Sequence, residues 1–195
     1  MTREDVEILN KQRVFSGYFG IDRYRLQHKL YDGGVSAELE REVFERGHVV
    51  AVLPLDIERE RVVLIEQFRP GAYAAGLDPW LLECVAGIIE PGESVERVAR
   101  REVREETGCD TGRIKQIARF MSSPGACSET VTLFWTEVDS ECAQGIHGLA
   151  DEGEDIRVCV MPIADAWAAA EDGRIVNAKT IIALQWLALN FATLN

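Results

Sequence analysis

The stretch GIIEPGESVERVARREVREETGC, residues 87–109, decides the fold of this chain. Gly87 ends an apolar run that is typical of a buried strand, and Glu90-Pro91-Gly92-Glu93 is typical of a turn. From about residue 94 to residue 107, apolar side chains recur at helical spacing. The stretch therefore predicts a strand, a glycine-containing loop and a helix in direct succession.

The core-facing stripe of this helix carries carboxylates as well as apolar groups. At 100° per residue, one face presents Val95, Val98, Ala99, Glu102, Val103 and Glu106. The first half of this face is apolar, as expected for a helix packed on a sheet. The second half places Glu102 and Glu106 in the same stripe, with Glu105 beside them.

Two interpretations of these glutamates are open from the helix pattern alone. The usual one is a solvated acidic face with ion pairs four residues apart, such as Arg101–Glu105. The other is a metal site, because carboxylates are almost never buried without a partner at the edge of a core. Oxygen donors without histidine or cysteine suit Mg²⁺ or Mn²⁺ rather than zinc.

The spacing of glycines and charged residues in this stretch resembles the Nudix box. The positions that match its fixed residues are Gly87, Glu93, Arg101, Glu102, Glu105, Glu106 and Gly108. Cys109 fills a slot that is normally aliphatic, a mild departure with little bearing on the chemistry. From about residue 38 onward the chain resembles the bacterial ADP-ribose pyrophosphatases of the Nudix superfamily, for example in REVFERGHVVAVLP and WLLECVAGIIEPGES. Pro124 lies at the offset from the box that marks the ADP-ribose subgroup, whereas the first 37 residues match more loosely.

This resemblance implies an α/β (α+β) fold, namely a Nudix α/β/α sandwich with a mixed sheet at about residues 46–195. It also implies an N-terminal antiparallel strand module at residues 1–45 that mediates dimerisation by strand exchange, hence a homodimer. The implied reaction is Mg²⁺-dependent hydrolysis of ADP-ribose to AMP and ribose 5-phosphate, with two or more ions and Mn²⁺ as a substitute. The alternatives are a hydrolase of another nucleoside diphosphate sugar and a non-catalytic ADP-ribose sensor. The complete box argues against the sensor.

The resemblance also implies roles for individual residues. The implied metal ligands are the Ala86 carbonyl, Glu102, Glu106 and Glu154. The implied catalytic residues are Glu152 as general base, with Glu154 as the second choice, Glu105 in a supporting role, and Arg101 to orient the carboxylates.

The implied substrate contacts are Phe19, Arg41, Arg46, Arg69, Ser123, Gly125 and Glu129. Arg41 would reach the site of the neighbouring subunit. Phe19 would stack on adenine, although an aromatic residue in a strand is more often part of the core. Arg69 is expected at a phosphate or ribose, with a surface ion pair as the alternative.

The rest of the chain predicts a layered domain with strands at residues 48–56, 61–69, 79–87, 114–121, 130–138 and 156–163. The first two strands should form a hairpin. Two helices should end the chain, the last one beginning at about Asn177. Short strands around Tyr18, Phe19 and Tyr24, broken by a turn at residues 32–34, are expected near the N-terminus.

Composition excludes some classes of function. The formal net charge of −12 argues against a nucleic-acid-binding surface, although a bound metal can reverse charge locally. The five cysteines are widely spaced without a Cys-x-x-Cys pair, which indicates a reducing compartment, and Cys84, Cys109 and Cys159 are expected to be buried. No long apolar run is present, so we expect no signal peptide, no membrane segment and a cytoplasmic protein.

Overall fold

The computed structural model describes residues 1–149 and 153–194, and the chain forms two compact units. The first unit comprises Met1–His48 and Met121–Thr130. The second comprises Val49–Phe120 and the residues from Val131 onward. The loop at residues 121–130 thus belongs to the same unit as the N-terminal strands.

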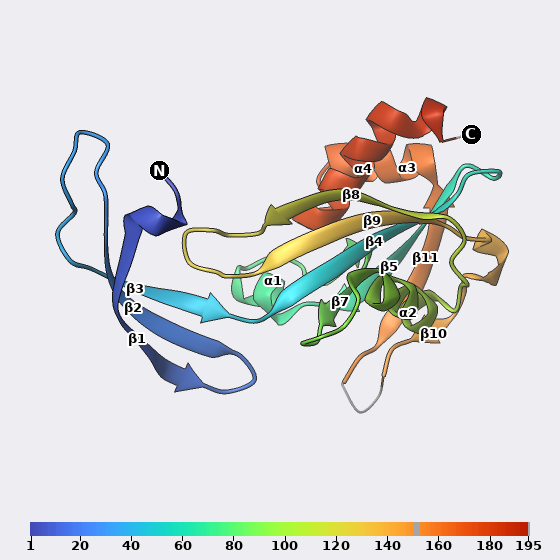
Figure 1. The fold of residues 1–195 in the computed structure, drawn as a ribbon. Helices are drawn as coiled ribbons and strands as arrows, with labels where there is room; N and C mark the ends of the chain where they lie inside the picture. Colours follow the sequence, from blue (N-terminus) through green and yellow to red (C-terminus); the bar gives the residue numbers. More distant parts are fainter. Residues whose placement is uncertain (150–152, 195) are drawn as a thin grey trace. The chain divides into compact units, whose positions relative to one another are not determined.

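An antiparallel sheet in the order β1-β2-β3 forms most of the first unit (Figure 1). Its elements are the short 3₁₀ turn η1 (Arg3–Asp5), β1 (Val6–Ser16), β2 (Gly20–His28) and β3 (Leu39–Glu45). The strands are longer than expected, and Tyr18 and Phe19 lie in the turn between β1 and β2 instead of within a strand. The turn predicted at residues 32–34 is present, with positive φ at Gly33 and Gly34. All of β1 is exposed in the single chain.

A mixed sheet in the order β10-β11-β5-β4-β9-β8 is the frame of the second unit. In that order the strands are Ile146–His147, Ile156–Pro162, Arg61–Phe68, His48–Asp56, Thr130–Glu137 and Ile114–Met121. β4 runs parallel to β9, whereas β5 runs antiparallel to both β4 and β11. The predicted hairpin is confirmed, because β4 and β5 pair directly beside their connecting turn.

The prediction of one continuous strand at residues 79–87 is wrong. The structure has β6 (Trp80–Glu83), which pairs with β5, and then β7 (Val85–Ile89), which pairs with β4. β4 and β5 pair with each other only at Leu55–Val62 and Asp56–Arg61, so further along each has a free edge. At Cys84 the chain passes from pairing with β5 to pairing with β4, so the backbone groups on the free edges of both strands are hydrogen-bonded. This change of strand brings Ala86 and Gly87 next to the predicted metal site.

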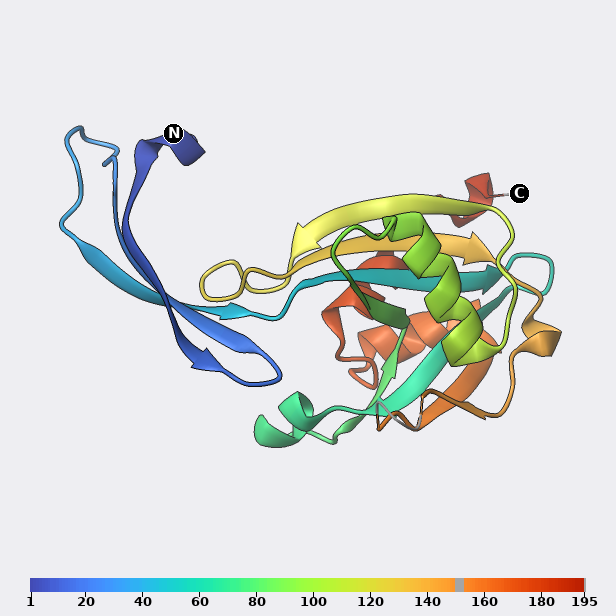
Figure 2. The same cartoon turned by 60° about the horizontal axis from the view of Figure 1, so that its bottom comes forward.

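Helices cover both faces of this sheet (Figure 2). α2 (Val95–Thr107) lies on one face, and α3 (Ile163–Glu171) and α4 (Ala178–Asn190) lie on the other. The described residues also form short helical turns at α1 (Pro70–Ala74), η2 (Ser140–Cys142) and η4 (Phe191–Thr193). α4 begins where predicted, because the Asn177 side chain accepts a hydrogen bond from the Thr180 N–H at 3.2 Å. The α/β/α sandwich with a mixed sheet is confirmed.

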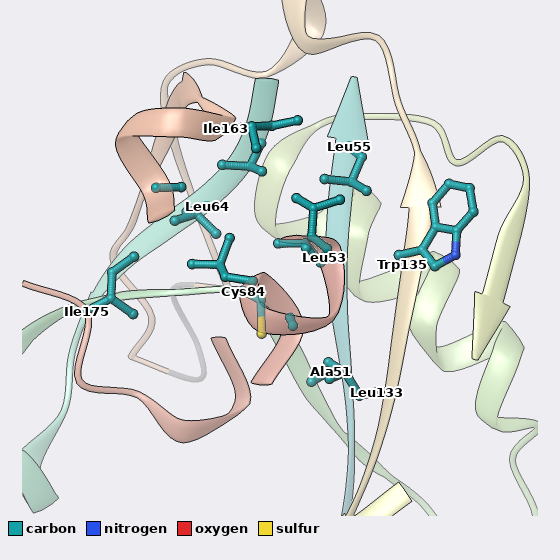
Figure 3. Packing of buried hydrophobic residues seen from close by; sticks show 14 of the residues in the cluster. Ala51, Leu53, Leu55, Leu64, Cys84, Leu133, Trp135, Ile163 and Ile175 are labelled. Atoms are coloured by element: carbon teal, nitrogen blue, oxygen red, sulfur yellow. The ribbon is translucent and has the colours of Figure 1, made fainter. Parts of the chain in front are cut away.

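Strict alternation along the central strands builds a separate core on each face. Leu53 and Leu55 of β4 point to α3 and α4, where they join Ile163 (Figure 3). Val50 and Val52 of the same strand point to the opposite face and pack against α2. Burying each Leu side chain stabilises the fold by about 1.5–3 kcal/mol. α2 is thereby held at a fixed height over the sheet.

All five cysteines are free thiols. Cys84 and Cys109 are buried as expected, whereas Cys159 is only partly buried. Within residues 1–149 and 153–194, no helix is long and apolar enough to cross a membrane.

Candidate active site

α2 carries its carboxylates on the face that meets the sheet. Val98, Val103 and Glu106 are all buried, and Glu106 is only 3% exposed. The Glu102 side chain is 14% exposed, one turn earlier on the same face. The helix ends at Gly108, whose φ of 74° is the left-handed conformation that favours glycine at this position.

Burial and mutual repulsion raise the pKa of these carboxyls. Burial and the charges of Glu102 and Glu154 raise the pKa of Glu106 well above its usual range, against one hydrogen bond from the Ala86 N–H at 3.2 Å. Burial also raises the pKa of Glu102, although Arg101 lowers it. Two carboxylates on one helix face, both with raised pKa values, indicate a site of excess negative charge.

Gly87 makes room for this arrangement. A Cβ atom added at Gly87 would lie 2.1 Å from Cδ of Glu102, and no real contact is that short. Because Gly87 belongs to β7, the glycine lets Glu102 reach down to the strand. The box glycine is therefore explained by a steric requirement in the second unit.

Arg101 ties the loop before the helix to the helix itself. Its Nη1 donates to Glu93 Oε1 at 2.9 Å, its Nη2 donates to Glu102 Oε1 at 2.8 Å, and its Nε lies 3.7 Å from Glu105 Oε2. The other oxygen of Glu93 accepts the Glu90 N–H at 3.1 Å. Arg101 thus contacts the glutamates that the resemblance assigns to it, and the ion pair with Glu105 that the sequence suggested also exists.

Arg69 forms an ion pair, as the alternative interpretation of this residue held, but its partner is the buried Glu83 rather than a surface carboxylate. Arg69 donates from Nε to both oxygens of Glu83 at 3.3 Å and from Nη2 to Oε2 at 2.8 Å. Glu83 is 1% exposed and stands opposite Ile65, whose side chain packs toward α2. Burial lowers the pKa of Arg69, but Glu83, with smaller contributions from Glu106 and Glu154, raises it above its usual value.

The sequence contains one signal for Glu83. Glu83 is a single acidic residue inside the apolar run WLLECVAG, and a charge in a buried strand needs a partner. The identity of that partner, 14 residues earlier in the chain, depends on the pairing of β5 with β6.

Glu154, in the acidic loop, is held by the backbone of Leu149. Its N–H donates to the Leu149 carbonyl at 3.1 Å, and its Oε2 accepts the Leu149 N–H at 3.3 Å. Its negative charge is a smaller cause of the raised pKa values of Glu102 and Glu106, after burial. Glu152, the predicted general base, lies outside the described residues.

The donor set fits a hard divalent cation. Buried Glu106 and partly buried Glu102, both with raised pKa values, and the backbone of Ala86 provide oxygen ligands and negative charge. Among residues 1–149 and 153–194, no three acidic, histidine or cysteine side chains are already drawn together as a finished metal cluster. In the described structure Glu106 turns to the Ala86 N–H and Glu102 turns to Arg101.

The other predicted substrate contacts all belong to the first unit. Arg46 Nη1 lies 3.0 Å from Glu129 Oε2, and the Arg46 guanidinium lies 5.4 Å from the centre of the Phe19 ring. Phe19 in turn meets Phe44 edge-on at 5.1 Å. Three of the predicted substrate contacts therefore lie together, namely Phe19, Arg46 and Glu129.

The remaining predicted contacts in this unit are exposed. Arg41 is exposed on β3, and its Nη1 donates to the neighbouring Glu40 carbonyl at 2.7 Å. Ser123 and Gly125 form an exposed turn in which the Ser123 carbonyl accepts the Cys127 N–H at 2.9 Å. This turn lies beside the group around Arg46, because Phe44, which meets Phe19, donates its N–H to the Ala126 carbonyl at 2.7 Å. The roles of Arg41, Ser123 and Gly125 stay predictions.

Comparison with known proteins gives matches over nearly the whole chain. The sequence pattern of the NUDIX domain family matches residues 45–184. The chain is 50% identical over 192 residues to an ADP-ribose pyrophosphatase of Escherichia coli (strain K12), covering 98% of this chain and 92% of that protein. It is 41% identical to an ADP-ribose pyrophosphatase of Haemophilus influenzae, covering 99% and 90%.

Two further matches are more distant. The chain is 33% identical to a GDP-mannose pyrophosphatase of Yersinia pestis, covering 95% of this chain and 93% of that protein. Among solved structures, the crystal structure of an ADP compounds hydrolase superimposes with a TM-score of 0.71 at 22% identity, covering 97% of this chain and 98% of the other. That likeness supports the fold.

Proposed function

Because this chain belongs to the NUDIX domain family, we propose that it hydrolyses the pyrophosphate bond of ADP-ribose to give AMP and ribose 5-phosphate. The observation that carries the proposal is the pair of buried Glu106 and partly buried Glu102 on the box helix, whose pKa values are both raised. The pKa of Glu102 is raised although Arg101 contacts it, and a site that keeps two such carboxylates together suits a cation that in turn binds a diphosphate. The two relatives of 41% and 50% identity are both ADP-ribose pyrophosphatases.

The Ala86 carbonyl, Glu102, Glu106 and Glu154 would hold Mg²⁺, with Mn²⁺ as a substitute and room for two or more ions. When bound, the metal supplies positive charge to the diphosphate oxygens. Arg101 keeps Glu102 and Glu93 in place through its two short hydrogen bonds, and Glu105 supports the same arrangement from the helix surface.

The chain's own residues bind the diphosphate and move the proton. Arg69 binds a phosphate oxygen, and Glu152 accepts a proton from the attacking water. The water oxygen forms a bond to one phosphorus in line with the bridging oxygen, the bond from that phosphorus to the bridging oxygen breaks, and the second phosphate leaves. Glu154 is the second choice for the base, because its Oε2 already accepts the Leu149 N–H.

The first unit would bind the adenosine part and a second copy of the chain. Phe19 stacks on adenine beside Arg46 and Glu129, which are already paired. The exposed strand β1 supports a homodimer formed through residues 1–45, with Arg41 acting in the site of the partner chain. The cytoplasm stays the predicted location, with neither nucleic acid nor membrane as a partner.

The second candidate substrate class, the nucleotide sugars, rests on one of the relatives. The Yersinia pestis relative is a GDP-mannose pyrophosphatase, so a nucleotide sugar is the second candidate. A non-catalytic sensor is the third, and it would bind ADP-ribose without turnover.

A hydrolysis screen separates the three candidates. The purified protein is incubated with Mg²⁺ and ADP-ribose, GDP-mannose or UDP-glucose, and the products are separated by chromatography. We expect the highest kcat/KM for ADP-ribose, with AMP and ribose 5-phosphate as products. Glu106→Gln is the negative control. A higher kcat/KM for GDP-mannose would replace the proposed substrate, and binding without any product would establish the sensor.

A further inference from the structure

We infer that Glu83 is a positioning residue that holds the Arg69 guanidinium in one orientation, so that its free edge faces the diphosphate of the substrate. This inference rests on the proposed function, because it needs a phosphate-containing substrate at Arg69. Glu83 has no role in the assignments drawn from the resemblance.

The Arg69–Glu83 pair is bidentate, through the Nε and Nη2 side of the guanidinium. Glu83 is buried and uses both carboxylate oxygens, which accept from Nε and Nη2 of Arg69 at 2.8–3.3 Å. The guanidinium is planar, so two engaged nitrogens fix the direction of the third. Among the described residues, Nη1 of Arg69 has no hydrogen-bond partner, and 34% of the Arg69 side chain is exposed.

The contact with Glu83 also determines which carboxylate charge Arg69 neutralises. Arg69 lies close enough to Glu106 and Glu154 for their charges to raise its pKa. Without Glu83, the acidic groups left to act on this partly buried guanidinium include these two predicted metal ligands. Glu83 therefore keeps Arg69 available for an incoming anion and away from the cation site.

The competing explanation is an ion pair that only stabilises the fold. A buried ion pair is weak evidence for stability, because desolvation offsets much of the attraction. The two explanations differ in what they predict for substrate affinity. A purely structural pair would change the thermal midpoint without changing the Kd of the folded protein.

The test uses Glu83→Gln, which keeps shape and removes the charge, together with Arg69→Gln and the double variant. The matched control is Glu66→Gln, which removes the carboxylate of another arginine pair on β5, with Arg157 at 2.7 Å. Three quantities are measured: the Kd of ADP-ribose in EDTA by calorimetry, kcat and KM with Mg²⁺, and the thermal midpoint. Binding in EDTA tests Arg69 without the metal.

We expect Glu83→Gln to raise both Kd and KM by about tenfold or more, because an oriented charge-assisted hydrogen bond is lost. We expect kcat to stay within about threefold and Glu66→Gln to leave all values unchanged. In the Arg69→Gln background, Glu83→Gln should have no further effect on Kd, because Glu83 acts only through Arg69. Glu83→Asp should restore part of the affinity.

An unchanged Kd in folded Glu83→Gln would overturn the inference, and so would additive effects in the double variant. If Glu83→Gln does not fold, the comparison of Glu83→Asp with wild type decides the point, since a carboxylate one methylene shorter must also weaken binding. Failure of the proposed function has a different signature. In that case the wild type would bind ADP-ribose in EDTA but give no AMP with Mg²⁺, while the Kd comparison still tests Glu83.

Discussion

Replacing Glu106 with Gln should make the metal-free protein more stable and the enzyme inactive. Glu106 and Glu102 are four residues apart on α2, so their Cβ atoms are about 5–6 Å apart. Two unit charges at that distance repel by about 3 kcal/mol at an effective dielectric constant of about 20. The amide oxygen of Gln can still accept the Ala86 N–H, at a loss of about 1 kcal/mol relative to a charged acceptor. The expected net gain is about 2 kcal/mol.

The effect has a defined dependence on pH. The folded-state pKa of Glu106 is raised, so the wild type loses stability as pH rises from the unfolded-state pKa through the raised folded-state pKa. Gln does not titrate and avoids this loss. The variant should therefore match the wild type near pH 4 and exceed it at neutral pH, by about 4–8 °C in thermal midpoint for a chain of this length.

Thermal unfolding in EDTA and in Mg²⁺, combined with the hydrolysis assay, tests this reasoning. Mg²⁺ should stabilise the wild type but not Glu106→Gln, because only the wild type keeps the full ligand charge. The control is Glu96→Gln on the exposed side of α2, whose carboxylate pairs with Arg100 at 2.9 Å and which should change stability by less than about 0.5 kcal/mol. A metal-free Glu106→Gln protein less stable than wild type at pH 7, or one with kcat within about tenfold of wild type in Mg²⁺, would refute the assignment.

Three further predictions concern other parts of the molecule. Glu152→Gln should lower kcat by about 10²–10⁴ with little change in KM, and Glu154→Gln should do less to kcat; a large loss only in Glu154→Gln would move the base there. Light scattering at micromolar concentration should give about twice the chain mass of 21.8 kDa, and a fully active monomer would contradict strand exchange. Asp56 is 3% exposed, and although burial opposes its ionisation, hydrogen bonds from Ser140 and Arg59 lower its pKa to about 2. Asp56→Asn should therefore cost about 2 kcal/mol at pH 7 in urea unfolding, a difference that shrinks as pH falls from about 4 toward 2.

Much of the fold followed from local patterns in the sequence. α2 begins and ends within a residue of the predicted positions, and the last helix begins within a residue of its predicted start, because helical periodicity and capping are local properties. The carboxylates of the box also lie where the stripe predicted, since the 100° repeat alone puts Glu102 and Glu106 on the buried side of the helix.

Only the tertiary structure determined the features that depend on strand pairing. A strand's alternation shows its buried side chains but not its neighbours, so the change of partner at Cys84 could not be predicted. The Arg69–Glu83 pair follows from that choice of partner, because the pairing of β5 with β6 brings Glu83 to Ile65 and hence to the face of α2. The close approach of the Glu102 carboxylate to Gly87, which a Cβ would displace, likewise depends on the height of α2 over β7, and this height is set by packing between residues far apart in the chain.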